Sequence, residues 1–270
     1  DDGVPSFRVR PDRSKPVLSV DVFFTQHGKV GDGPEDMEKI KHRFWHCAEP
    51  EETDGVWTAK LPLSNVEKPL WVYANVAYPL AEPVSGAGYY YGIYTAEFFN
   101  VSSLLQVATA EELASAAAQA TRKPSLLIES FQGDWEREWF TYRPDEWARS
   151  THKIGDETYA APDGATLAID ILAQQPNTLI ILIDDYAAEV PFSGGDQWQT
   201  VVLRPQDFRD AGGNPLLGWK NIKRLKLTTA EHLKPKRGSE GTPKRIGKSW
   251  SGPKPQFRNL RWQLKNPSNE

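Results

Sequence analysis

Residues 178–192 read TLIILIDDYAAEVPF and contain the most apolar run of the chain. The first six residues are typical of a buried strand, and AAEVPF (187–192) is typical of a second strand. Adjacent residues of a strand point to opposite faces of the sheet. We therefore do not expect Asp184 and Asp185 to act as a carboxylate pair on one substrate; one of them either lines a binding face or holds a turn.

Similar strand patterns fill the second half of the chain on both sides of this stretch. They are SLLIESF (125–131), ATLAIDIL (165–172), WQTVVL (198–203), IKRLKLTT (222–229) and FRNLRWQL (257–264). GGD (194–196) and DAGGNP (210–215) are typical turns, and only PQDFRDAGG (205–213) indicates a helical turn. We predict one β domain over residues 125–270.

The first half also reads as β structure, in PVLSVDVFFT (16–25), GVWTAKLPL (55–63) and PLWVYANVAY (69–78). About seven short strands at this spacing predict a small sandwich of immunoglobulin or fibronectin type III style over residues 1–100. MEKIKHRFWHC (37–47) has helical spacing and forms either a short helix or a decorated loop. Thr109 with Glu112 three residues later predicts a capping box, so we expect a helical linker over residues 101–124.

Composition excludes several classes of protein. The chain has 270 residues and one cysteine, Cys47, so no disulfide forms within it. No apolar run reaches the roughly 18 residues of a membrane span. The opening DDGVPSF has no initiator Met, so we expect a processed protein or an excised fragment. Residues 232–270 carry a net charge of +8 and the remainder −12. This asymmetry indicates either an anionic partner or a basic strand and loop packed on an acidic body.

We find no pattern that predicts catalysis. The Gly-x-Ser-x-Gly elbow of serine hydrolases is absent from the sequence. His42 and His46 are spaced for one helix face beside Cys47, but a further zinc ligand pair is missing. The basic segment lacks the interleaved aromatics of nucleic-acid grooves. We therefore expect no catalytic residues, cofactor, metal, nucleic acid or membrane partner, and whether the chain is an enzyme stays uncertain.

The stretch FQGDWEREWFTYRPDEW (131–147) places three tryptophans among charged residues. If 137–143 is a strand, Trp139, Thr141 and Arg143 share one face and Glu138, Phe140 and Tyr142 the other. One face then packs on the core and the other is exposed to solvent. Either the tryptophans pack structurally, or Trp139 or Trp147 forms a platform for sugar stacking.

The stretch from Trp198 to Leu227 resembles galactose-binding-like jelly rolls. The residues that carry the resemblance are Trp198, Asp207, Phe208, Trp219, Ile222, Leu225 and Leu227. SLLIESF and FRNLRW are similar to the first and last strands of such modules, which often bind carbohydrate. Many relatives hold calcium between an acid in the first strand and an Asp in the last. Glu129 fills the first place, but Arg258 stands in the second, so we expect an ion pair between them instead of calcium.

The whole chain is similar to the C-terminal accessory portion of secreted bacterial hydrolases of the dienelactone-hydrolase-like or acetyl-xylan-esterase-like type. KPVLSVDVFFTQHG (15–28), WTAKLPL (57–63), KPLWVYANVAYPL (68–80) and GAGYYYG (86–92) carry this resemblance. None of the catalytic part is present. The resemblance implies a secreted or periplasmic accessory fragment.

Two functions follow as hypotheses. In the first, the jelly roll binds carbohydrate, and the basic loop makes an anionic polysaccharide the expected ligand. In the second, both sandwiches form a docking scaffold for a hydrolase catalytic domain and bind no glycan. The candidate carbohydrate-binding residues are Trp139, Trp147, Tyr142, Arg149, Asp185 and Tyr186, and the candidate anion contacts are Lys236, Arg237, Lys244 and Arg245.

Overall fold

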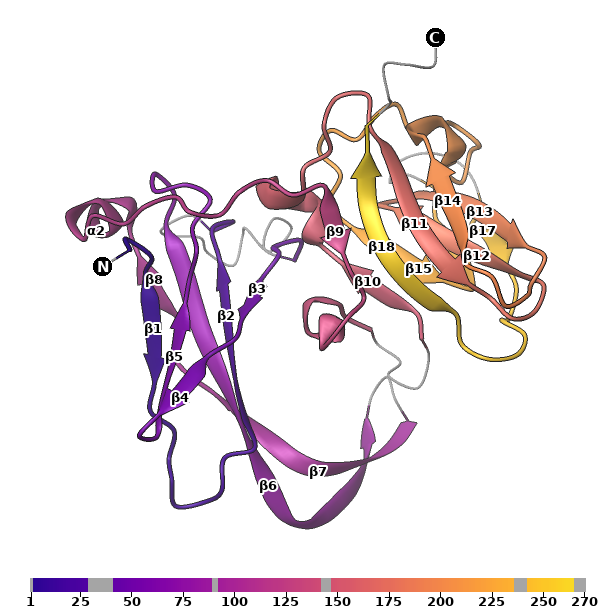
Figure 1. Ribbon diagram of the computed structural model, residues 1–270. Coiled ribbons are helices and arrows are strands. Elements are labelled where there is room, and N and C mark those ends of the chain that lie inside the picture. The colour runs from indigo at the N-terminus through magenta and orange to yellow at the C-terminus, as the bar shows by residue number, and fades with distance from the viewer. Residues whose placement is uncertain (1, 29–40, 89–91, 142–146, 236–241, 265–270) are drawn as a thin grey trace. The chain divides into compact units, whose positions relative to one another are not determined.

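The computed structural model describes residues 2–28, 41–88, 92–141, 147–235 and 242–264. The chain divides into a first unit, Asp1–Lys123, and a second unit, Pro124–Glu270 (Figure 1). Described residues of both units are mainly in antiparallel β-strands, which confirms the predicted mainly β class. No helix among the described residues is long and apolar enough to cross a membrane.

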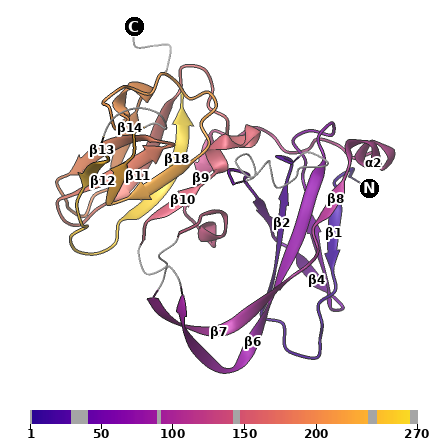
Figure 2. The same ribbon diagram turned by 180° about the vertical axis from the view of Figure 1, so that it is seen from behind.

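The first unit contains two antiparallel sheets. One has the order β1-β5-β4, and the other has the order β3-β2-β6-β7, with β8 also pairing with β6. Both views show β6 and β7 as a long hairpin (Figures 1 and 2). The strands are β1 Ser6–Val9, β2 Ser19–Thr25, β3 His46–Ala48, β4 Glu51–Thr53, β5 Val56–Lys60, β6 Leu70–Gly88, β7 Gly92–Ser102 and β8 Gln106–Ala108.

Alternation in the sequence determines which side of the larger sheet is buried. Val72, Ala74 and Val76 of β6 face the core of the first unit with Val22 and Phe24 of β2. Side chains at the intervening positions face the other side, where Phe23 stacks on Tyr73 with ring centroids 5.3 Å apart. Each strand thus separates a buried aliphatic face from a half-buried aromatic one.

Of two local predictions for the first unit, one is wrong and one is confirmed. His46 lies in strand β3, where its ring contacts Phe24 at 5.1 Å, so His42 and His46 do not share a helix face. The predicted capping box is confirmed in α2, Ala110–Ser115: the Glu112 N–H donates to Thr109 Oγ1, and the Thr109 N–H donates to Glu112. Residues 101–123 belong to the first unit, to which they contribute β8 and α2.

The second unit consists mainly of two four-stranded antiparallel sheets, β10-β15-β12-β13 and β14-β11-β18-β9. Their inner faces share one core that includes Ile169, Ile181, Leu227 and Trp262. The strands are β9 Leu127–Glu129, β10 Arg149–Thr151, β11 Thr166–Leu172, β12 Asn177–Ile183, β13 Tyr186–Phe192, β14 Gln199–Leu203, β15 Leu225–Thr228 and β18 Gln256–Gln263.

Strand β12 is buried on both faces, which explains why its sequence is apolar without alternation. Leu179 and Ile181 face the shared core, whereas Ile180 and Leu182 face outward. A hairpin of β16 (Ala230–Leu233) and β17 (Lys244–Gly247) covers this outer side through Leu233 and Ile246. Part of the basic segment, expected as a long loop, is therefore a packed hairpin.

Asp184 holds the turn between β12 and β13. Ile183 pairs with Tyr186, and Asp184 adopts a positive φ of 52°. Its carboxylate accepts the backbone N–H groups of Lys223 and Arg224, at 3.1 and 2.9 Å. Burial raises the pKa of Asp184 by more than these donors lower it. Asp184 therefore serves the fold, the second of the two roles considered for this acid pair.

Candidate functional site

The tryptophans of residues 131–147 pack against the core of the second unit. Trp139 is only 6% exposed, and Trp135 and Trp147 are half-buried against the same core. Residues Trp135–Glu138 form a 3-10 turn, so the expected strand does not begin at Arg137. A ring enclosed like that of Trp139 offers no face to a sugar, which corrects the expectation of a stacking platform there.

Glu129 pairs with a cation other than the one expected. Lys153 Nζ lies 2.8 Å from Glu129 Oε2 and 2.6 Å from Glu138 Oε2. The Trp139 indole N–H donates to Glu129 Oε2 at 3.0 Å. Arg258 instead contacts Asp170, at 3.4 Å. The inference of an ion pair in place of calcium thus named the wrong cation, because nothing local in the sequence links Glu129 to Lys153.

Burial lowers the pKa of Lys153, but Glu138 and Glu129 together outweigh it and raise that pKa above its usual value. The ammonium therefore stays charged at neutral pH. This cluster is closed, since Lys153 and Glu129 are both almost fully buried. Its contacts serve the fold of the second unit and leave little room for a ligand.

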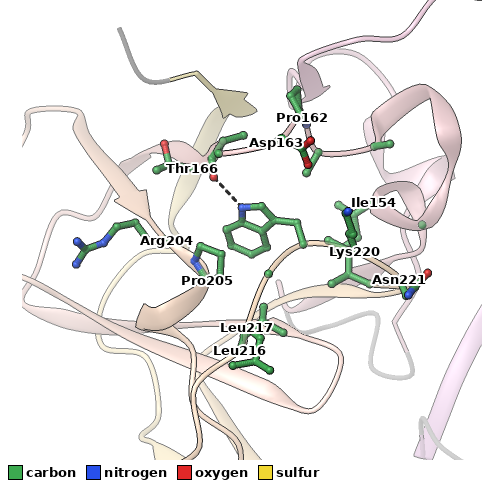
Figure 3. A pocket seen from close by; sticks show the side chains of 18 of the residues that line it. Ile154, Pro162, Asp163, Thr166, Arg204, Pro205, Leu216, Leu217, Lys220 and Asn221 are labelled. Atoms are coloured by element: carbon green, nitrogen blue, oxygen red, sulfur yellow. Dashed lines mark hydrogen bonds between the residues drawn. The ribbon is translucent and has the colours of Figure 1, made fainter. Parts of the chain in front are cut away.

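Loops at one end of the second unit line a pocket of about 960 Å³ that is open to solvent (Figure 3). The lining comes mainly from three separate segments of the sequence: residues 154–166 with gaps, 204–206 and 216–222. Tyr186, at the start of β13, also lines it. It is the one candidate sugar-binding residue among those that line this pocket.

Short turns fix the loops that form the pocket. The turns are the 3-10 helices Lys153–Gly155, Glu157–Tyr159 and Pro205–Asp207. Asp156 Oδ1 accepts the Thr158 N–H at 2.8 Å. Asp207 accepts the Arg204 N–H at 2.7 Å. The Pro205–Asp207 turn confirms the helical turn predicted within PQDFRDAGG.

Trp219 forms part of the pocket lining and is itself fixed. Its indole N–H donates to the Ala165 carbonyl at 2.8 Å, drawn in Figure 3, and its ring lies 5.1 Å from that of Trp262. Only 9% of Trp219 is exposed. A buried indole with its N–H satisfied is a rigid base for a binding site. Nearby Leu217 is 93% exposed.

The side chains around the pocket supply both hydrogen-bond donors and acceptors. Figure 3 shows Asp163 from one segment, Arg204 from a second, and Lys220 and Asn221 from the segment that carries the central indole. Burial raises the pKa of the neighbouring Asp207, but its bonds to Arg204 outweigh this and lower it. This mixture of charges and amides can hydrogen-bond a polar, neutral or weakly charged ligand.

The other candidate residues lie elsewhere or outside the described residues. Arg149 is largely buried and contacts Glu136 at 3.3 Å, and Asp185 is exposed in the β12–β13 turn. Lys244 and Arg245 are exposed on β17. Tyr142, Lys236 and Arg237 lie outside the described residues.

Sequence reasoning missed most of the pocket, because its segments are brought together only by the fold. Trp219 was noticed for its resemblance to jelly rolls, and the turn at Pro205 was predicted. Neither pattern indicated that the two segments meet. Within the parts of the chain that the structure describes, no group of three or more His, Cys, Asp or Glu residues is arranged to hold a metal ion.

Comparison with known proteins gives no relative: the chain matches no family model, no curated protein and no solved structure.

Proposed function

We propose that the second unit is a galactose-binding-like jelly roll that binds carbohydrate in the loop pocket without converting it. The observation that carries this proposal is the pocket itself, about 960 Å³ in volume and built on the fixed indole of Trp219. Ligand pockets commonly fall in the range of roughly 300–1,000 Å³. The size suits a short oligosaccharide.

The chemistry of the lining supports a saccharide. Sugar hydroxyl groups both donate and accept hydrogen bonds, and the pocket offers carboxylates, amides and cations to match. Pro162, Pro205 and Tyr186 add flat apolar surfaces to the same lining. The C–H face of a sugar ring packs well on such surfaces.

Binding without turnover is proposed because the sequence contains no catalytic pattern. The described residues that line the pocket include no His, Cys or Ser, so a Ser or Cys nucleophile with a His base is not among them. The carboxylates in the lining are Asp156, Glu157 and Asp163, and Asp156 is buried with one oxygen bonded to the backbone. A saccharide-binding accessory unit is expected outside the cell or in the periplasm, where polysaccharide substrates lie.

A glycan array followed by calorimetry tests the proposal. The double variant Lys220→Ala/Asn221→Gly should bind the best glycan at least tenfold more weakly, because two hydrogen-bonding side chains of the pocket are lost. Glycine at 221 tolerates the positive φ of 61° found there. Asp185→Ala is the matched control, since Asp185 is exposed beside Tyr186 but does not line the pocket. Equal binding by the double variant and the parent would refute the pocket.

A docking scaffold is the second candidate, and exposed apolar side chains of the first unit favour it. Val101, Leu104, Leu105 and Val107 lie within seven residues at the junction of β7 and β8, each 40–83% exposed. Contiguous exposed apolar surface often marks a protein interface. We infer that this strip would contact a hydrolase catalytic domain in a larger protein.

Sedimentation velocity distinguishes this candidate from the first. Mixing the chain with an isolated hydrolase domain of the dienelactone-hydrolase-like type should give a complex, and Leu104→Ser/Val107→Ser should remove it. No complex at micromolar concentrations would argue against the scaffold. The pocket variants should leave this association unchanged.

A further inference from the structure

A bulge in strand β18 places two arginines on the same outer face of their sheet. Arg258 pairs with Asp170 of β11, and Arg261 pairs with Ala168, so Asn259 and Leu260 together oppose Ile169. In a regular strand, residues three apart point to opposite faces. The extra residue corrects for this, and Asn259 adopts a positive φ of 54°, as the first residue does in one class of bulge.

The carboxylate of Asp170 holds both arginines in position. Arg258 Nε lies 3.4 Å from Asp170 Oδ2, and Arg261 Nη1 lies 3.3 Å from Oδ1. Thr200 and Asn259 also donate to this carboxylate, at 2.8 and 3.0 Å. Burial raises the pKa of Asp170, but these hydrogen bonds and the charge of Arg261 outweigh burial, so the net pKa lies below its usual value. The group is therefore anionic at neutral pH.

Both guanidinium groups keep unused donors. Arg258 meets Asp170 through Nε, and its two terminal nitrogens make no hydrogen bond to any described residue. Arg261 uses Nη1 for Asp170 and the Asn259 carbonyl, which leaves Nε and Nη2. The side chains of Arg258 and Arg261 are 46% and 31% exposed. Two held arginines with one buried aspartate leave a net charge of about +1 at this surface.

Apolar side chains flank the arginine pair. The Arg258 guanidinium lies over the ring of Trp198, 4.2 Å from its centroid, which fixes its plane. Val202 of β14 and Leu127 of β9, which stands opposite Arg261, are 48% and 43% exposed. The face therefore combines two guanidinium groups held in position with apolar side chains. Exposed lysines on a solvated surface lack both features.

We propose that this arginine pair binds the carboxylate of an acidic saccharide, of the uronic acid class. A guanidinium matches a planar carboxylate by two parallel N–H···O bonds, and arginines fixed in advance lose little entropy on binding. The choice of a saccharide as the bearer of the carboxylate rests on the proposed function. The site itself is separate from the loop pocket, since Asp170 lies four residues along β11 from Thr166, on the order of 13 Å.

Calorimetry with the full chain tests this site, using a galacturonic acid oligosaccharide and its methyl ester as probes. The parent should bind the acid at least tenfold more tightly than the ester, and salt at about 0.5 M should reduce the difference. Arg258→Gln/Arg261→Gln should bind the two probes equally. Arg8→Gln/Arg10→Gln, which removes two exposed arginines from the first unit, is the matched control and should retain the preference.

A third variant guards against misfolding. Asp170→Asn/Arg258→Gln/Arg261→Gln removes the whole ionic cluster, so that no buried carboxylate is left without a cation, and it should also lose the preference for the acid. Equal binding of acid and ester by the parent would overturn the inference. So would a preference for the acid that is retained in both the Arg258→Gln/Arg261→Gln variant and the triple variant. In either case, loss of ester binding in Lys220→Ala/Asn221→Gly would still support saccharide binding in the loop pocket.

Two further outcomes separate the inference from the function on which it rests. If an oligoglutamate peptide binds through Arg258 and Arg261 more tightly than the acidic saccharide does, the proposed ligand class is wrong and the site binds acidic peptides. Binding of no saccharide, acid or ester, would overturn both the inference and the proposed function.

Discussion

The buried ammonium of Lys153 shows how single residues determine the structure of the second unit. It lies against both Glu129 and Glu138, and Glu129 in turn accepts the Trp139 N–H. Sequence reasoning correctly expected a cation beside Glu129 but chose Arg258. The strand register that separates Arg258 from Glu129 depends on a bulge, and one residue of slip changes the face of a side chain.

Replacing Lys153 with methionine should destabilise the second unit by about 3–5 kcal/mol, because the buried Glu129 and the partly buried Glu138 lose this cation. Chemical denaturation followed by tryptophan fluorescence measures the loss. The triple variant Glu129→Gln/Glu138→Gln/Lys153→Met is the control and should recover part of it. A loss below about 1 kcal/mol would mean that water reaches the cluster.

The pH dependence gives a second measurement on the same residue. The raised pKa of Lys153 means that its contribution is fully present below the unfolded value of about 10.4 and is lost only as pH rises through the higher folded value. The parent contribution should therefore be constant from pH 5 to about 9. Denaturation of the parent and of Lys153→Met at several pH values in this range measures the contribution as the difference between their unfolding free energies.

Among the elements, β12 and β18 show what a sequence pattern contains and omits. The apolar run of β12 predicted a buried strand, and the structure adds the reason, a hairpin that covers its outer side. The same reasoning placed strand β18 but did not predict its bulge. Asn259 is a residue that tolerates positive φ, but nothing in FRNLRWQL specifies where the strand adds a residue.

Two substitutions at Asn259 should separate backbone strain from side-chain bonding. Asn259→Val should cost about 2 kcal/mol or more, because a β-branched residue is strained at φ 54° and the bond to Asp170 is lost. Asn259→Gly loses the same bond without the strain and should cost about 1 kcal/mol or less. Thermal unfolding of the two variants measures the difference. Equal losses would indicate that the bulge relaxes at little cost.

The whole molecule consists of two units with separate cores, and the sequence predicted two β domains joined by a helical linker over residues 101–124. The structure divides the chain between Lys123 and Pro124, so that most of the expected linker belongs to the first unit. Strand content was predictable because alternation and turns are local. The loop pocket was not, because it depends on contacts between segments as far apart in the sequence as residues 154–166 and 216–222.

Residues 124–270 expressed alone should unfold in one cooperative transition, because their core draws on both sheets of the second unit only. Calorimetry of this fragment beside the full chain measures the expectation, and the melting temperature of the fragment should match one transition of the full chain. A broad transition with dye binding to exposed apolar surface would show that the two units share stabilising contacts.

The bulge in β18 also has an evolutionary consequence. Deletion of the codon for Asn259 would leave Arg258 and Arg261 two residues apart in a regular strand, and residues two apart share a face. The strand would then lose its bulge while both arginines stay on the solvent side. Descendants of this chain that lack one residue there but retain both arginines should therefore be grouped as keeping the pair on one face.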